Sequence, residues 1–173
     1  PTPWAQYSGK DIPQLPDNVA GTTYKRDNDW TTTDGWSGYG ASVSVANGRL
    51  VIAKTNASQY AIKTFSSDFN PQTCILRVRL VSGSLYLNRV TLDFRSSTGA
   101  YLNSAIFTVP NDGTWVTVNK YYSNPSARIT WIYPGAYENA TQATIEIESI
   151  YIGTGAYDRL VFDNSYHYRH LLN

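Results

Sequence analysis

Apolar and polar residues alternate along most of this chain, in short runs separated by Gly, Asn, Asp, Ser and Pro. Alternation with a period of two is typical of β-strands that bury one face, and regular turn residues between such runs favour an antiparallel sandwich. The predicted strands are Ala41–Val45, Arg49–Lys54, Gln59–Phe65, Thr73–Val81, Asn88–Arg95, Ser104–Thr108, Trp115–Tyr121, Ala127–Tyr133 and Ala143–Gly153. The pattern contains no convincing amphipathic helix. The sequence therefore predicts an all-β fold, an antiparallel two-sheet β-sandwich with no significant helix.

The two ends of the chain lack this alternation. Residues 1–26, with prolines at positions 1, 3, 13 and 16, are typical of an extended N-terminal arm or linker. Residues 27–153 form the predicted sandwich domain, and residues 154–173 are expected to form a C-terminal extension, packed on the domain or leaving it. From the Pro1-Thr2-Pro3 start without Met, we expect a piece of a larger modular protein, which could be oligomeric.

Two local signals define turns and irregularities. Asn47-Gly48, between two alternating runs, predicts a tight hairpin because Asn and Gly both tolerate positive φ. In the last predicted strand the apolar positions are odd at Ile145 and Ile147 but even at Ile150 and Ile152. A regular strand cannot bury both sets, so we expect a β-bulge near Glu148-Ser149.

Strand parity also assigns charged residues to outer faces. Arg77 and Arg79 alternate with apolar residues in one run, and Asp93 and Arg95 do so in another. If these strands share a sheet with the run at 115–121, its outer face carries Arg77, Arg79, Asp93, Arg95, Thr117 and Asn119. Two interpretations stay open: a cross-strand ion network, or Arg and Asp side chains that bind sugar hydroxyls or an anionic sugar substituent.

The composition excludes several classes of protein. The chain has 14 Tyr, 5 Trp and 5 Phe, whereas disordered chains are poor in aromatic residues. A formal net charge of +1 with dispersed basic residues does not predict nucleic-acid binding, and no apolar run is long enough to predict membrane insertion. The single Cys74 cannot form an internal disulfide or a cysteine metal cluster, and we expect it to be a buried structural thiol.

Several segments, taken in their order along the chain, resemble the strands and turns of a known protein family. They are Asp34-Gly35-Trp36, the run Asn47-Gly48-Arg49-Leu50-Val51-Ile52, the run Leu92–Gly99, Gly113-Thr114-Trp115-Val116-Thr117-Val118, and Ile145–Gly153. Together they resemble the jelly-roll carbohydrate-binding modules that are appended to glycoside hydrolases and occur in similar form in phage tail and baseplate adhesion proteins. The resemblance implies a jelly roll and a role in binding polysaccharide. No cofactor is required for that role.

The resemblance also raises the question of a structural calcium ion. The closing strand of such modules commonly carries an Asp pair that helps to hold calcium, whereas this chain has Glu148-Ser149 there. Glu148 could still ligate a hard cation, with Asp27 or Asp29 contributing from the region of the first strand. Calcium therefore remains a possible ligand, with Asp27, Asp29 and Glu148 as its candidate site.

Aromatic side chains supply the chemistry for sugar binding, because the C–H face of a sugar ring packs on an aromatic ring. Trp36 and Tyr39 lie in a Gly-rich stretch that we expect to be a loop displaying them. The position of Trp131 is compatible with either the core or a binding platform. Trp115 is more typical of a residue that packs in the fold than of one that binds a ligand. The candidate ligand-binding residues are Trp36, Tyr39, Tyr60, Arg77, Arg79, Asp93, Arg95, Trp131, Tyr133 and Tyr137, with Trp30 as a further aromatic candidate.

We therefore expect a non-catalytic module that recognises a cell-surface or cell-wall polysaccharide, as part of a phage adhesion device that binds its host receptor. It would be extracellular or virion-associated. The alternative is a structural or assembly module that mediates protein–protein contacts. Catalysis is not expected, because Glu146 and Glu148 lie on one strand and cannot easily flank a glycosidic bond.

Overall fold

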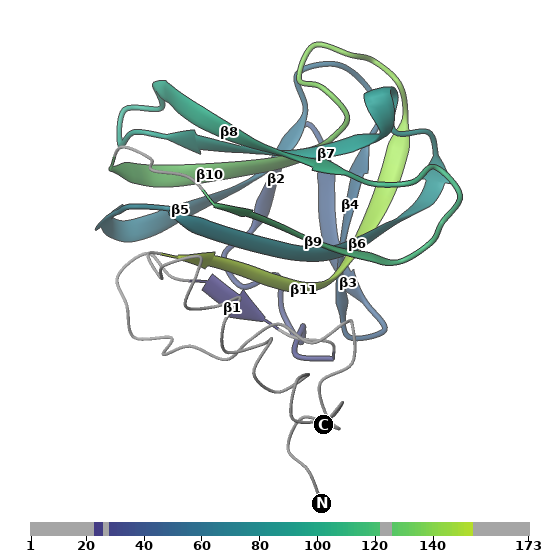
Figure 1. The fold of residues 1–173 in the computed structure, drawn as a ribbon, viewed down its shortest axis with the longest axis horizontal. Helices are drawn as coiled ribbons and strands as arrows, with labels where there is room; N and C mark the ends of the chain where they lie inside the picture. Colours follow the sequence, from purple (N-terminus) through teal and green to yellow (C-terminus); the bar gives the residue numbers. More distant parts are fainter. Residues whose placement is uncertain (1–22, 26–27, 122–125, 154–173) are drawn as a thin grey trace, which may run out of the picture.

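A computed structural model describes residues 23–25, 28–121 and 126–153 of the chain. Two antiparallel sheets pack face to face, and Figure 1 shows them as two layers. Within the described residues the helical element is a short 3-10 turn, Tyr86–Asn88. None of the described residues forms a helix long and apolar enough to cross a membrane. The predicted all-β, two-sheet sandwich is confirmed.

The first sheet, sheet A, has the strand order β3-β4-β11-β6-β9, and β1 also pairs with β11. Its strands are β1 (Thr23–Lys25), β3 (Ser42–Ala46), β4 (Arg49–Lys54), β6 (Thr73–Gly83), β9 (Val116–Tyr121) and β11 (Ala143–Gly153). The second sheet, sheet B, has the order β2-β5-β10-β7-β8. Its strands are β2 (Ser37–Tyr39), β5 (Tyr60–Phe69), β7 (Arg89–Arg95), β8 (Tyr101–Thr108) and β10 (Ala127–Pro134).

Two strands lie where none was predicted. Thr23–Lys25, within the predicted N-terminal arm, form β1 and pair with residues 150–152 of β11. Ser37–Tyr39, within the Gly-rich stretch, form β2 at the edge of sheet B. The remainder of the predicted arm and the C-terminal extension lie outside the described residues, so the division into three parts stays a prediction.

The core lies between the two sheets and contains the apolar residues that alternation placed inward. Leu76 and Val78 from sheet A and Leu92 and Phe94 from sheet B are almost completely buried there. Cys74 is also buried in this core, as predicted, and burial raises the pKa of its thiol. The apolar contact between the two sheets supplies the main driving force for the fold.

The two predicted local features are present. Asn47 and Gly48 have φ values of 53° and 72° and connect β3 to β4. Ala46, the last residue of β3, pairs with Arg49, the first residue of β4, across the turn. The pairing of β11 with β6 shifts between Ile147 and Ser149, so a β-bulge lies at Glu148. The bulge lets Ile147 and Ile150 both enter the core.

Candidate functional site

The outer face of sheet B carries a row of planar side chains that crosses all five of its strands. The strand register places Tyr39 of β2 beside Tyr60 of β5, and Arg95 of β7 beside Tyr101 of β8. Trp131 of β10 lies between these two pairs. We call Tyr39, Tyr60, Trp131, Arg95 and Tyr101 the aromatic row.

Neighbouring members of the aromatic row lie face to face. The ring centroids of Tyr39 and Tyr60 are 4.9 Å apart, and those of Tyr60 and Trp131 are 3.7 Å apart, with interplanar angles of 11° and 9°. The guanidinium carbon of Arg95 lies 3.5 Å from the centroid of the Trp131 ring and 5.6 Å from that of Tyr101. Aromatic stacking and cation–π contacts of this kind hold flat groups in a fixed orientation.

Exposure is greatest at the two ends of the row. Tyr39 exposes 62% of its surface and Tyr101 exposes 56%, whereas Tyr60 is buried beneath its neighbours. Burial is the largest cause that raises the pKa of the Tyr60 phenol, followed by the nearby Tyr137 and Tyr39. The rings most open to a ligand are therefore those of Tyr39 and Tyr101, at the two ends of the row.

Tyr137 joins the row from the segment that follows β10. Its ring centroid is 5.7 Å from that of Trp131 and 6.2 Å from that of Tyr60. Two contacts hold this segment: the Ser58 main-chain N–H donates to the Tyr137 carbonyl oxygen at 2.8 Å, and the buried Lys54 ammonium donates to the Ala136 carbonyl oxygen at 2.6 Å. Burial lowers the pKa of Lys54.

Asp93 is the polar centre of this face. It is buried, and its Oδ1 accepts hydrogen bonds from Ser104 Oγ at 2.7 Å and from Tyr133 Oη at 3.0 Å. Its Oδ2 lies 3.4 Å from Arg95 Nη2. Burial, followed by the charge of Asp93, raises the pKa of Tyr133. Asp93 thus orients Arg95 and Tyr133, and Tyr133 supports the row from below rather than displaying its own ring.

Two tryptophans considered as ligand platforms lie instead in the core. Trp36 exposes only 2% of its surface and Trp30 is equally buried. Trp36 directly precedes β2 and is buried, whereas Ser37 and Tyr39 of that strand are exposed, so Trp36 lies on the inward side of the edge strand. The expectation that a loop displays Trp36 is wrong because the Gly-rich stretch is a strand, and the exposure of Tyr39 follows from the same alternation.

The predicted outer face with six polar residues divides between the two sheets. Asp93 and Arg95 belong to sheet B, but Arg77 and Arg79 lie on β6 of sheet A, which pairs with β9 and β11. Thr117 and Asn119 pair with Arg77 and Ile75 on that same sheet. Alternation gives the inward and outward sides of a strand but not its partners, so the assumption that all three strands share a sheet is wrong.

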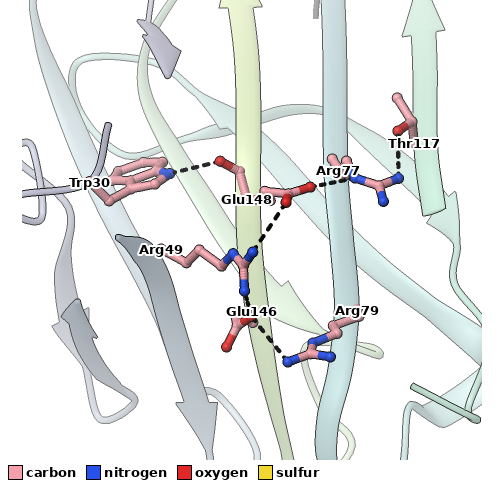
Figure 2. A network of polar contacts seen from close by, with 7 residues as sticks. All are labelled: Trp30, Arg49, Arg77, Arg79, Thr117, Glu146 and Glu148. Atoms are coloured by element: carbon pink, nitrogen blue, oxygen red, sulfur yellow. Dashed lines mark hydrogen bonds and ion pairs between the residues drawn. The ribbon is translucent and has the colours of Figure 1, made fainter. Parts of the chain in front are cut away.

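Arg77 and Arg79 belong to an ion-pair network on the outer face of sheet A, shown in Figure 2. Arg77 donates through Nε to Glu148, and Arg49 lies 3.3 Å from both Glu146 and Glu148. Arg79 Nη2 lies 3.3 Å from Glu146 Oε1. Trp115 packs beside these arginines, half-exposed and outside the core. We call this group the arginine network: Arg49, Arg77, Arg79, Trp115, Glu146 and Glu148.

The structure shows where two of the three predicted calcium ligands, Glu148 and Asp29, lie. Glu148 exposes only 3% of its side chain and is ion-paired to two arginines, so a cation there would compete with them. The part of the chain that the structure describes contains no group of three His, Cys, Asp or Glu side chains placed to hold a metal. Asp29 is exposed and Asp27 lies outside the described residues.

The sequence interpretation missed Lys54, Tyr101 and Ser104 as part of the sheet B site. Tyr101 precedes the predicted strand 104–108, and β8 in fact begins at Tyr101. A register shift between Phe94 and Arg95 brings Arg95 opposite Tyr101. The alternation of Tyr101 with apolar residues is weak, so the strand pairing was needed to find it.

No protein-family model matches the chain, and no curated protein sequence matches it. Solved structures do match its fold. A mutant of a family 29 carbohydrate-binding module aligns with 80% of this chain and 96% of its own, with a TM-score of 0.55 and 14% identity. Another mutant of such a module, complexed with cellulohexaose, aligns with 82% of this chain and 97% of its own, with a TM-score of 0.53 and 16% identity.

A further structure described as a family 29 carbohydrate-binding module aligns with 80% of this chain and 92% of its own, with a TM-score of 0.53 and 16% identity. The chain therefore has the jelly-roll β-sandwich fold of carbohydrate-binding modules, as the resemblance implied. At these identities the likeness establishes the fold alone, so function must be argued from the site.

Proposed function

We propose that the outer face of sheet B binds carbohydrate without cleaving it. The observation that carries this proposal is the aromatic row, which crosses five strands and ends in the exposed rings of Tyr39 and Tyr101. With about 4.8 Å between adjacent strands, the four intervals of the sheet span roughly 19 Å. A row of this length suits an oligosaccharide better than a single sugar.

The chemistry of the row suits a saccharide. The C–H faces of sugar rings pack against the exposed aromatic surfaces, and the hydroxyl groups pair with planar polar side chains. Arg95, which the buried Asp93 orients, offers a donor beside Trp131. Because the row is already stacked within the free protein, little side-chain ordering is left for the ligand to induce, and this preorganisation favours binding.

The carboxylates of the arginine network argue against hydrolysis. Glu146 and Glu148 lie on the same strand and are ion-paired to arginines, so they do not face each other across a bound sugar. Glycoside hydrolysis requires two carboxyl groups that flank the scissile bond. The fold shared with carbohydrate-binding modules supports the same conclusion.

The proposal extends to the setting of the domain. We place it in an extracellular or virion-associated protein, as one module of a phage adhesion device that recognises a cell-surface or cell-wall polysaccharide of the host. Single-site affinity would be modest, and several copies in an oligomeric parent would raise it by increasing the effective concentration.

Calorimetric titration with a panel of neutral hexasaccharides, including cellulohexaose, tests the sheet B site. We expect saturable binding, weakened about ten- to a hundred-fold by Trp131→Ala because the ring that holds Tyr60 and Arg95 in position is lost. Tyr86→Ala is the control, since Tyr86 is exposed outside the row. If no saccharide in the panel or on a glycan array binds, the proposal fails and the alternative of an assembly module gains support.

A further inference from the structure

The outer face of sheet B carries a second arginine, Arg89, at the start of β7. Val90 and Leu92 of this strand are buried in the core. Arg89 alternates with them, so its side chain lies on the outer face. β7 lies between β10 and β8, and Arg89 pairs with Thr108 of β8. Arg89 therefore belongs to the same face of the sandwich as the aromatic row.

Arg89 differs from the other arginines that the structure describes in having no ion-pair partner. The other five are paired with carboxylates: Arg49, Arg77, Arg79, Arg95 and Arg128. The side chain of Arg89 makes no ion pair and no hydrogen bond within the described part of the chain. A guanidinium does not lose its proton in proteins, so Arg89 carries a positive charge that no contact in this part of the structure balances.

The guanidinium of Arg89 is partly buried, and its outer end is open to a ligand. Nε is buried without a partner, whereas the two terminal nitrogens, Nη1 and Nη2, are not buried. These two atoms can donate parallel hydrogen bonds to the two oxygens of one carboxylate. Because part of the group is removed from water, an anion that pairs with its outer end is attracted more strongly than it would be by a fully exposed arginine.

The neighbours of Arg89 on this face are uncharged. Thr91, the next outward residue of β7, is buried, and its hydroxyl donates to the Gly135 carbonyl oxygen at 2.8 Å. Thr108, opposite Arg89, and Ile106, opposite Thr91, are both exposed on β8. These neighbours offer no carboxylate that would compete with a ligand for Arg89. Ile106 adds an apolar surface against which the C–H groups of a sugar can pack.

Arg89 lies within reach of a saccharide that occupies the aromatic row. Trp131 pairs with Asp93, and Arg89 is four residues from Asp93 along the same strand. At about 3.3 Å per residue this separation is roughly 13 Å, which is shorter than the roughly 19 Å that the row itself spans. A saccharide long enough to cover the row is therefore long enough to extend from Trp131 to Arg89.

We propose that the saccharide bound by sheet B is acidic, and that one of its carboxylates pairs with the terminal nitrogens of Arg89. This inference rests on the proposed function, because it names the class of ligand that the same face binds. The aromatic row binds the sugar rings, and Arg89 selects those that carry a carboxylate. A neutral saccharide would leave the charge of Arg89 unpaired and would therefore bind more weakly than an acidic one.

Calorimetric titration with matched pairs of hexasaccharides tests this proposal. The pairs are the hexamers of galacturonic, glucuronic and mannuronic acid, each with its methyl ester as the neutral match. We expect at least one acid to bind about tenfold more tightly than its ester, because a charge-assisted pair with Arg89 is added. Binding of that acid should also require the aromatic row. If Trp131→Ala leaves it intact, the acid binds elsewhere and the proposal is overturned.

Replacement of Arg89 by Gln identifies the residue that reads the charge. Arg89→Gln should weaken binding of that acid about tenfold, so that it binds no more tightly than its ester. Because the Arg89 side chain makes no hydrogen bond in the described structure, the variant should fold with the melting temperature of the wild type. Arg128→Gln is the matched control, since it removes the same charge from an ion pair with Asp68 on the same sheet and should leave the affinity unchanged. Equal weakening by both substitutions would indicate nonspecific attraction and overturn the proposal.

The titrations separate this proposal from the proposed function on which it rests. If the esters bind as tightly as the acids, sheet B binds carbohydrate, but the acidic ligand is ruled out. If neither the acids, nor their esters, nor the panel of neutral hexasaccharides bind, both proposals fail.

Discussion

Replacing Glu148 by Gln tests how much the arginine network contributes to the free energy of unfolding. The substitution keeps the size of the side chain but removes the charge that Arg49 and Arg77 share, and it turns an amide donor toward one of them. Glu148 exposes 3% of its side chain, and the two arginines expose 26% and 17%. Loss of one partner of a fully buried ion pair costs about 3–5 kcal/mol.

The partial exposure of the arginines reduces this cost, because water can replace part of the lost interaction. We therefore expect Glu148→Gln to lower the free energy of unfolding by about 2–4 kcal/mol. At a urea m-value of about 2 kcal/mol/M, this corresponds to a fall of roughly 1–2 M in the midpoint. The m-value itself should not change.

Urea unfolding followed by tryptophan fluorescence measures the effect. The control is Asp68→Asn, which removes a carboxylate from the exposed ion pair with Arg128, where an effect of about 0–1 kcal/mol is expected. A Glu148→Gln effect no larger than that of the control would refute the argument that burial makes this network important for stability.

Three further substitutions test other parts of the structure. Trp36→Ala should lower the free energy of unfolding by about 3–5 kcal/mol in urea unfolding, because it leaves a cavity in the core, whereas a display position would tolerate it. Tyr133→Phe should cost about 1–3 kcal/mol at pH 7, since buried Asp93 loses a donor. The pKa of Tyr133 is raised in the folded state, so its contribution is fully present below pH 10.0 and is lost as the pH rises toward the folded-state pKa. The difference in unfolding free energy between wild type and Tyr133→Phe should therefore be smaller at pH 11 than at pH 9. The pKa of Lys54 is lowered in the folded state, so between that lowered value and 10.5 the unfolded chain binds more protons than the folded one. In this range the stability of the wild type should therefore rise with pH relative to that of Lys54→Met. Parallel pH profiles of stability for the two proteins would contradict this.

The sequence was most informative about features that depend on neighbours in the chain. Asn47-Gly48 predicted its hairpin because both residues tolerate positive φ, and the change of parity between Ile147 and Ile150 predicted the bulge. Both are properties of one short segment. The aromatic character of Tyr39, Tyr60 and Trp131 made them candidate ligand-binding residues, although Tyr39 was assigned to a loop and lies in β2.

Features that depend on pairing between distant strands were harder to predict. Arg77 and Arg95 have the same outward parity, yet they lie on opposite faces of the sandwich because β6 and β7 belong to different sheets. Trp36 was assigned to a loop because β2 has only 3 residues and contains Gly38, so its alternation was too short to recognise. The contact of Arg95 with Trp131 requires the register of β7 against β10, which sequence periodicity does not contain.

The central claim is that a saccharide binds along the aromatic row of sheet B. The most direct test is a backbone NMR titration of the wild-type protein with the neutral hexasaccharide that binds best in calorimetry. We predict that the shifted signals concentrate on the strands that carry Tyr39, Tyr60, Trp131, Arg95 and Tyr101. Shifts confined to sheet A, or spread evenly over both sheets, would contradict the account.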